Sequence, residues 1–423
     1  MAEQLNLSQW MNEIFSSIRK KPLSNITIPG SHDACAYNLS TTEIAPFAPA
    51  ALNSCLVRNC CGCVSQNFAL AQSDNLFEQM QSGSRYLDIR VTFDEKRNLL
   101  RTEHSLYGLP IRQLLQQVAL FIELAPSEFV ILHLRHFSVT KHYDMNSMHH
   151  KQILDLLQET FSNNELFMKR DELHLPFEVL KERGRCLQII YGISSEEQAN
   201  TLDWIHLEMN VLPGTFRTFN LNLFLEHNSD VIEHVLTFHY SYLFLFIHLH
   251  HTWPSLDLRS ASADGAGWSN SQSVEDLQEK LEIVINNHQG KEDIMYKIAG
   301  ALTPDDTVVK DGILNCILCC ICRCICTTKC FKPASLREIS DVTGAHLMKT
   351  VFKNVKEKGN RINIIDMDHI SRQQSKRKLM ESVVLLNVDD DEETNTSKHL
   401  RKFDSFTLNR IKIHVETGEI KEG

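Results

Sequence analysis

The chain has little glycine or proline, no excess of positive charge and no long apolar segment. Of its 423 residues, 16 are glycine and 11 are proline, and 43% are hydrophobic, as in ordinary globular proteins. A formal net charge of -10 argues against a nucleic-acid-binding protein. Because no run of about 20 apolar residues occurs, a membrane-spanning helix is not expected. The length allows one large domain with insertions or two smaller domains.

The N-terminal residues lack the features of a secretory signal, since residues 1–5 contain no basic segment followed by an apolar one. We therefore expect a cytoplasmic protein. Peripheral contact with a membrane is an open alternative, because short basic clusters occur at 19–21 and 372–378. Without a signal, the 13 cysteines do not predict a disulfide framework. Seven of them lie within 316–330, where acylation, metal binding and the absence of any role are the alternatives.

Strand-like apolar segments alternate with helical patterns over the first half of the chain. Strands are expected at 25–28, 86–91, 98–102, 129–134, 186–192, 242–249 and 361–365. Helices are expected near 10–19, 76–82, 111–125 and 151–161. We expect Pro29 and Gly30 to end the first strand, and Gly83 to cap a helix. Such alternation predicts parallel strands covered by helices, and the absence of a glycine-rich loop after the first strand favours a (β/α) barrel over an open nucleotide-binding sheet.

The sequence also predicts how the chain is divided. We expect a helical lead-in at 1–20 and one α/β barrel domain at 21–387, with insertions near 40–65 and 255–345. From residue 388 the chain turns acidic and polar, so we expect a disordered tail at 388–423.

Two histidines follow strand-like segments, and a carboxylate and an arginine lie between them in the sequence. His32 follows the segment 26–31, and His104 ends the segment 99–104. Histidine can take up and return a proton near neutral pH. Asp88 and Arg90 lie two residues apart on a predicted strand and therefore share one of its faces. This set of groups suits phosphoryl transfer at the mouth of a barrel, while a buried structural ion pair is the alternative explanation for Asp88 and Arg90.

Four segments, in order, resemble the X domain of phosphatidylinositol-specific phospholipase C (PI-PLC): 26–33, 85–90, 129–134 and 361–368. The last is similar to the closing strand of animal proteins that contain an X domain alone. The resemblance implies a distorted TIM barrel that cleaves the glycerol–phosphate bond of an inositol phospholipid, through a cyclic inositol phosphate. It implies that His32 is the general base and His104 the general acid, with bell-shaped pH dependence. Either Asp366 or Asp368 should orient His32, and the motif register favours Asp368.

The same resemblance bears on metal binding. Calcium-dependent relatives carry Asn after the first histidine, and acidic residues where this chain has Asp88, Arg90 and Arg135. Two guanidinium groups would repel calcium, so the chain is more similar to the metal-free bacterial enzymes. This implies that Arg90 binds a phosphate oxygen and is fixed by Asp33 and Asp88, and that Arg135 contacts substrate. No metal or other cofactor is expected.

Two other functions are alternatives. The resemblance is weak between residues 195 and 355, so the protein could be a phosphoinositide-binding or scaffold module without useful turnover. A glycerophosphodiesterase would need an acidic metal cluster that Arg90 and Arg135 interrupt. The expected partner is an inositol phospholipid at a membrane surface, with no nucleic acid.

Overall fold

The structure is a computed structural model, and it describes residues 5–46, 48, 62–140, 143–192, 205–207, 257–260, 278–279, 281–282, 285, 294–299, 340, 347, 350–351, 353–359, 362–370 and 374–388. The strand expected at 242–249, the cysteine-rich segment 316–330 and the tail after residue 388 lie outside these residues. Among the helices that the structure describes, none combines the length and the apolar composition needed to cross a membrane.

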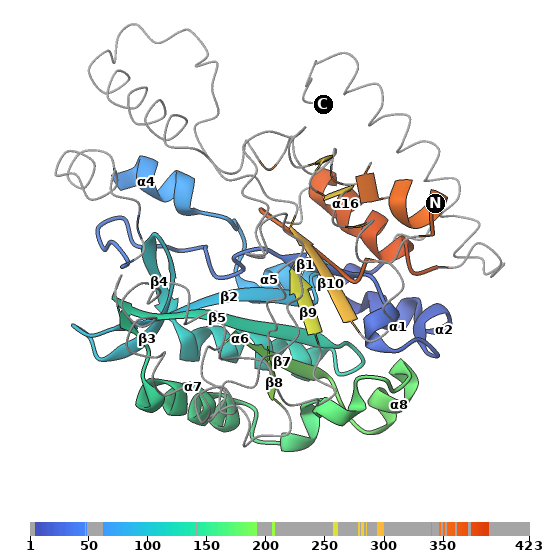
Figure 1. Ribbon diagram of the computed structural model, residues 1–423, viewed down its shortest axis with the longest axis horizontal. Helices are drawn as coiled ribbons and strands as arrows, with labels where there is room; N and C mark the ends of the chain where they lie inside the picture. The colour runs from blue at the N-terminus through green and yellow to red at the C-terminus, as the bar shows by residue number, and fades with distance from the viewer. Residues whose placement is uncertain are drawn as a thin grey trace, which may run out of the picture.

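Eight parallel strands follow one another around the sheet in sequence order (Figure 1). On one side of β1 lie, in turn, β2, β5, β7 and β8, and on its other side lie β11, β10 and β9. Their bounds are Ile28–Ser31 (β1), Tyr86–Asp94 (β2), Val130–Thr140 (β5), Leu187–Tyr191 (β7), Ile205–Leu207 (β8), Asp257–Ser260 (β9), Ile294–Ala299 (β10) and Ile364–Met367 (β11). Because the first strand pairs with the last, the order is that of a barrel, in which the described residues leave β8 and β9 unpaired with each other.

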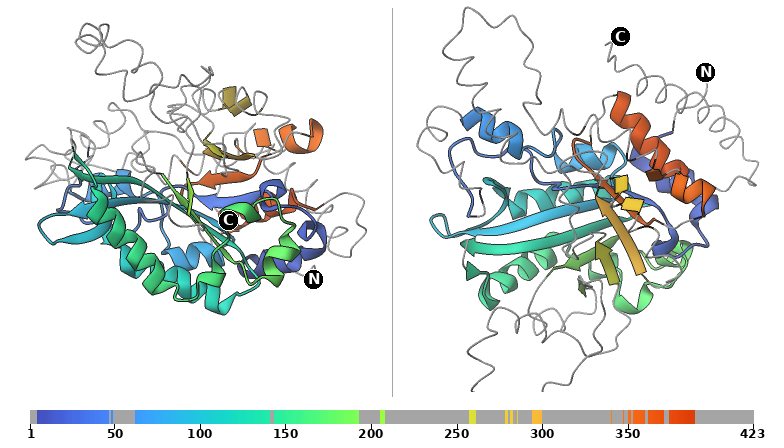
Figure 2. Two further views of the ribbon diagram at one scale, coloured as in Figure 1. Left: turned by 60° about the horizontal axis from the view of Figure 1, so that its bottom comes forward. Right: turned by 45° about the horizontal axis from the view of Figure 1, so that its top comes forward.

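Helices α6 (Ile111–Leu124) and α7 (Ser147–Thr160) cover the outer face of the sheet at β2 and β5 (Figure 2). Both confirm the helices expected there. Leu87 and Ile89 pack in one buried cluster with Leu114 and Val118 of α6. Since side chains alternate along a strand, Asp88 and Arg90 face the opposite side, which is the barrel interior. The same alternation directs His133 and Arg135 of β5 inward, because they pair with Asp88 and Arg90.

Most of the remaining elements are short. In the described part of the chain, the other α-helices with assigned bounds are α1 (Trp10–Glu13), α2 (Phe15–Ile18), α4 (Gly62–Ala69), α5 (Leu76–Gln81), α8 (Phe177–Glu182) and the longer α16 (Gln374–Leu385). The chain also forms the 3-10 helices η1 (Leu7–Gln9), η2 (Leu23–Asn25), η4 (Asn164–Leu166) and η5 (Arg170–Glu172). Two further elements are the π-helix η6 (Lys353–Glu357) and the edge strand β6 (Tyr143–Asp144). Gly83 follows α5 with a φ of 110°, as expected of a capping glycine.

The predicted end of the first strand is wrong. Pro29 and Gly30 belong to β1, whose central position explains the difference. Pro29 has no N–H to donate, but its carbonyl accepts the N–H of Arg85 in the neighbouring segment. Gly30 lies so close to Tyr86 that a Cβ at this position would be 2.8 Å from Cδ1 of the tyrosine ring. The neighbouring segment therefore allows both residues to lie within the strand, and no turn forms there.

The strand expected at 98–102 is not a barrel strand. It belongs to β3 (Leu99–His104), which runs antiparallel to β2 and pairs with β4 (Leu106–Pro110). The three strands form a twisted ribbon that extends from the barrel mouth (Figure 1). His104, at the end of β3, thus reaches the barrel from a ribbon.

A buried ion pair holds the N-terminal helices against the barrel. The guanidinium of Arg85 donates to Glu128 at 2.7 and 2.9 Å and also to the carbonyls of Leu7 and Ser8. The carboxylate of Glu128 accepts the backbone N–H groups of Met11 and Asn12 as well. One buried pair thus joins three segments that are distant in the sequence.

Glu128→Ala should lower the free energy of unfolding by about 3–5 kcal/mol, because it leaves the buried guanidinium of Arg85 without its counterion. Urea unfolding monitored by circular dichroism would measure the loss. The matched control is Glu159→Ala, which breaks the exposed pair with Arg112 and should leave the midpoint unchanged. Equal midpoints for the two variants would contradict this account of the N-terminal contact.

Candidate active site

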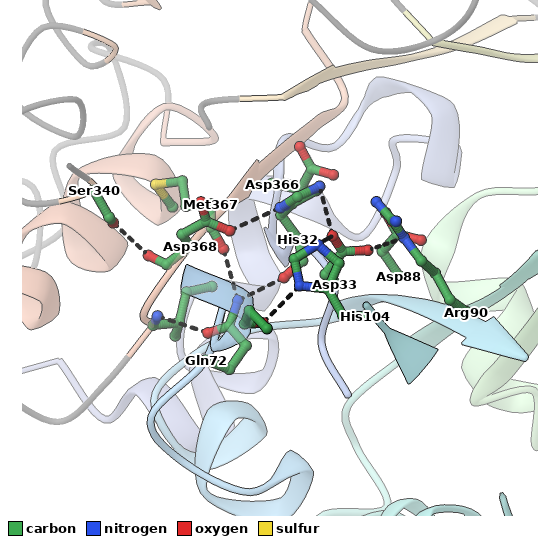
Figure 3. A network of polar contacts seen from close by, with 12 residues as sticks. His32, Asp33, Gln72, Asp88, Arg90, His104, Ser340, Asp366, Met367 and Asp368 are labelled. Atoms are coloured by element: carbon green, nitrogen blue, oxygen red, sulfur yellow. Dashed lines mark hydrogen bonds and ion pairs between the residues drawn. The ribbon is translucent and has the colours of Figure 1, made fainter. Parts of the chain in front are cut away.

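The residues expected to form the site do lie together, at the carboxyl ends of the barrel strands (Figure 3). His32 and Asp33 follow β1, Asp88 and Arg90 are on β2, Arg135 is on β5, and Asp368 follows β11. His104 joins them from the end of β3. Parallel strands bring their carboxyl ends to one rim of a barrel, which explains how residues from distant parts of the chain meet there.

His32 is held between two carboxylates. Its Nδ1 lies 2.7 Å from Oδ1 of Asp368, and its Nε2 lies 3.3 Å from Oδ2 of Asp33. Burial alone lowers the pKa of His32, but the charges of Asp33 and Asp368 outweigh it and hold that pKa above the ordinary value. Of the two aspartates considered for this contact, Asp368 is the one that contacts the ring.

His104 has one ring nitrogen fixed by the backbone. Its Nδ1 lies 2.6 Å from the carbonyl oxygen of Ala69, so this nitrogen carries the proton and donates it. The opposite nitrogen, Nε2, lies 3.2 Å from Oδ2 of Asp33. Burial, assisted by the positive charge of Arg90, lowers the pKa of His104 despite the nearby carboxylate. The pKa of His32 is therefore above the ordinary histidine value, and the pKa of His104 is below it.

Asp33 is the shared partner of both histidines and of Arg90. Its Oδ1 lies 2.5 Å from Nε of Arg90, while its Oδ2 faces the two imidazoles. Burial would raise the pKa of Asp33, but Arg90 and the histidines hold it well below the ordinary value. The backbone of Asp33 has a φ of 40°, a left-handed conformation that aspartate tolerates better than most residues.

Asp88 pairs with Arg135 and not with Arg90, which corrects the expectation that Asp88 fixes Arg90. Both oxygens of Asp88 accept from Arg135, at 2.5 Å each. The ammonium group of Lys297 on β10 lies 3.6 Å from Asp88 and 3.2 Å from Asp366. Burial raises the pKa of Asp366, and Lys297 opposes that rise. The pairing differs because Arg135, directly beside Arg90 in the strand register, reaches Asp88 with both donors.

His32, Asp33 and Asp88 place ligand atoms within 4.8 Å of one another, which is the arrangement of a cation site. The charges around these atoms do not fit one, however. Arg90 contacts Asp33, and Arg135 and Lys297 contact Asp88. A calcium ion needs several oxygen ligands and would meet three cations here. The residues present therefore suit an anion better than calcium.

Comparisons with known proteins agree with the topology. No protein-family model matches the chain. It is 28% identical over 167 residues to PI-PLC X domain-containing protein 2 of Mus musculus, and 25% identical over 167 residues to PI-PLC X domain-containing protein 3 of Danio rerio. Each match covers 38% of this chain and 47% or 50% of the relative. Over this part of its length, the chain is similar to PI-PLC X domain-containing proteins. It spans about half the length of the curated relatives it matches.

Solved structures show the same barrel. A PI-PLC from S. aureus, described in terms of its membrane binding, superposes with a TM-score of 0.53 over 92% of this chain and 100% of its own, at 14% identity. A second S. aureus PI-PLC structure, with a fluorinated phenylalanine, gives 0.52 over 89% and 97%, at 13% identity. The predicted α/β fold, a TIM-type barrel with insertions, is confirmed.

Two buried residues next to the site, Lys297 and Gln72, were not predicted from the sequence. Lys297 lies on β10, in the part of the chain where no strand was expected near it. Its only signal is a lysine inside the apolar run 294–299. Gln72 follows α4, whose first residues, 62–65, fall in the insertion expected near 40–65. His133 on β5 forms a 2.6 Å hydrogen bond with the hydroxyl of Tyr86 in the barrel interior.

Asp368→Asn should lower the pKa of His32, because it removes one of the negative charges that oppose the effect of burial. NMR titration of protein labelled at histidine Cε1 would measure the shift, with the His32 signal assigned from a His32→Gln variant. Asp155→Asn, at an exposed site on α7, is the control and should leave His32 unchanged. An unaltered His32 titration in Asp368→Asn would contradict the role of this carboxylate.

Proposed function

We propose that this protein is a PI-PLC-type phosphodiesterase that cleaves the glycerol–phosphate bond of an inositol phospholipid without calcium. One observation carries the proposal: Nε2 of His32, Nε2 of His104 and Nε of Arg90 all face one small anionic group, the carboxylate of Asp33. Two proton-transfer groups and a guanidinium directed at one point are what in-line displacement at phosphorus requires. The relation to the X-domain proteins and the bacterial PI-PLC fold supports the same reaction.

In the proposed reaction, Nε2 of His32 takes the proton of the inositol 2-hydroxyl. The freed oxygen attacks the adjacent phosphorus, and the bond between phosphorus and the glycerol oxygen breaks. Nε2–H of His104 gives its proton to that leaving oxygen. The products are diacylglycerol and inositol 1,2-cyclic phosphate, and no co-reactant is needed. Asp368 would hold Nδ1 of His32 and stabilise the imidazolium that forms, as in other base–carboxylate pairs.

The proton positions of the free protein must change when the substrate binds. The base must start neutral and the acid protonated, yet the surroundings raise the pKa of His32 and lower that of His104. A bound phosphodiester carries a negative charge next to His104 and neutralises Arg90, which is one of the groups that lower the pKa of His104. Substrate binding would therefore favour the protonated acid. Because the groups are close together, their titrations are coupled.

Arg90 would stabilise the charge that develops on the nonbridging phosphate oxygens. Its side chain is 20% exposed, whereas that of Asp33 is 1% exposed, so the guanidinium lies on the open side of the pair. Arg135 is 12% exposed and is held by Asp88, from which it can contact the polar headgroup. We therefore propose Arg90 as the phosphate-binding residue and Arg135 as a substrate-binding one.

His32→Ala and His104→Ala should each reduce cleavage of phosphatidylinositol by at least about 100-fold, since each removes a proton-transfer group. The measurement is release of water-soluble inositol phosphate from labelled vesicles, with the wild-type protein in parallel. His174→Ala, which changes an exposed histidine before α8, should keep full activity.

Circular dichroism should show that the two site variants fold normally, because neither side chain belongs to the apolar core. Near-normal cleavage by either one would refute the two-histidine mechanism. A wild-type protein that binds vesicles but releases no product would instead support the alternative, a phosphoinositide-binding module.

A further inference from the structure

A short segment that begins with the last residue of α4 contacts both histidines of the site. Residues 69–72, called the brace here, connect α4 with the turn that leads to α5. At one end, the carbonyl of Ala69 accepts the Nδ1 proton of His104 at 2.6 Å. At the other end, Gln72 is completely buried and contacts the loops that carry His32 and Asp368. One four-residue segment therefore reaches both sides of the site.

The side chain of Gln72 uses both halves of its amide. Its Nε2 donates to the carbonyl of His32 at 2.7 Å and to that of Met367 at 3.0 Å (Figure 3). Its Oε1 accepts the N–H of Ile370 at 2.9 Å. Two carbonyls from different strand ends thus share one donor group, so the distance between the two loops depends on this amide.

Backbone hydrogen bonds fix the brace itself. The N–H of Gln72 donates to the carbonyl of Ala36, at 3.1 Å, in the loop after β1. The carbonyl of Ala71 accepts the N–H of His369, at 2.7 Å, in the loop after β11. Outside the brace, the hydroxyl of Ser340 donates to the carbonyl of Asp368 and so also holds the loop after β11. The brace is therefore attached to the loops on both sides of the His32–Asp368 pair and cannot shift without moving them.

We propose that the brace sets the relative positions of His32, Asp368 and His104, with Gln72 as the positioning residue for the first two and the Ala69 carbonyl as that for the third. The proposal rests on the proposed function, since it assigns the brace a role in that reaction. Gln72 touches no proton-transfer atom and acts through the backbone. Because a hydrogen bond between His32 and Asp368 weakens steeply with distance and angle, a displacement of about 1 Å is enough to lose it.

The structure provides a matched control in Gln79. This residue is also completely buried, and its Nε2 likewise donates to two carbonyls, those of Ala34 and Asp74. Neither of these carbonyls belongs to the residues of the His32–Asp368 pair. Gln72→Met and Gln79→Met therefore remove the same kind of buried amide, and a purely structural effect should be similar in both.

Gln72→Met should lower the pKa of His32, because the variant loosens the contact with Asp368, whereas Gln79→Met should not. The charged and titratable groups around His32 remain unchanged in both variants: Asp33, Asp88, Asp366, Asp368, His104 and, beyond Asp366, Lys297. Asp368→Asn provides the second arm, since in that background Gln72→Met should cause no further shift of His32. Cleavage of phosphatidylinositol should fall by about 100-fold in Gln72→Met and stay near wild type in Gln79→Met.

The closing experiment is a histidine Cε1 NMR titration of the wild-type protein, both methionine variants and the double variant, followed by vesicle cleavage assays on the same samples. Equal His32 titrations in wild type and Gln72→Met, or equal shifts in the two methionine variants, would overturn the proposal. If Gln72→Met does not fold, Gln72→Asn replaces it, since that variant keeps the amide but shortens its reach. A shifted His32 in a protein whose wild type cleaves no phosphatidylinositol would support the brace and refute the proposed function.

Discussion

The carboxylate of Asp33 is the point on which the geometry of the site depends. One oxygen contacts both imidazoles, and the other contacts Arg90. The residue follows β1 with left-handed backbone geometry, so the chain turns immediately after His32 and directs the carboxylate across the barrel mouth. Without this anion, Arg90 and the two histidines would face one another with no group between them.

Beneath the rim, the barrel interior holds several charged residues. Lys297 lies between Asp88 and Asp366, and Asp88 in turn holds Arg135. Buried ion pairs of this kind add little net stability compared with apolar residues of the same size, although removing one partner is costly. Their value here is geometric, because a guanidinium held by two short contacts has little freedom to rotate. Stability comes instead from apolar packing, for example where Leu87 and Ile89 on the outward faces of the strands pack against α6.

The sequence was most informative where motif and periodicity coincide. The order of the motif segments in residues 26–135 was enough to select His32, Asp88, Arg90 and His104, and the structure places them together. Helical periodicity located α6 and α7 for the same reason, since each has a clear apolar stripe. The pairing of Asp88 with Arg135 was not predictable, because it depends on which side chain of a neighbouring strand reaches farther.

Features that depend on distant contacts escaped prediction. Pro29 and Gly30 look like a turn in the sequence and become part of β1 only because Arg85 and Tyr86 lie beside them. The strands β8, β9 and β10 are three to six residues long and lie in none of the motif segments. Gln72 is the first polar residue after the apolar run 68–71, and nothing in the sequence indicates the two carbonyls that its amide meets.

The most direct test of the central claim is the identity of the first phosphorus-containing product. Wild-type protein would be incubated with phosphatidylinositol vesicles in EDTA and followed by phosphorus NMR. We expect a growing resonance of inositol 1,2-cyclic phosphate, because the proposed reaction uses the inositol 2-hydroxyl as the nucleophile and Arg90 in place of a metal. An acyclic inositol phosphate as the first product, or a product that forms only after calcium is added, would contradict it.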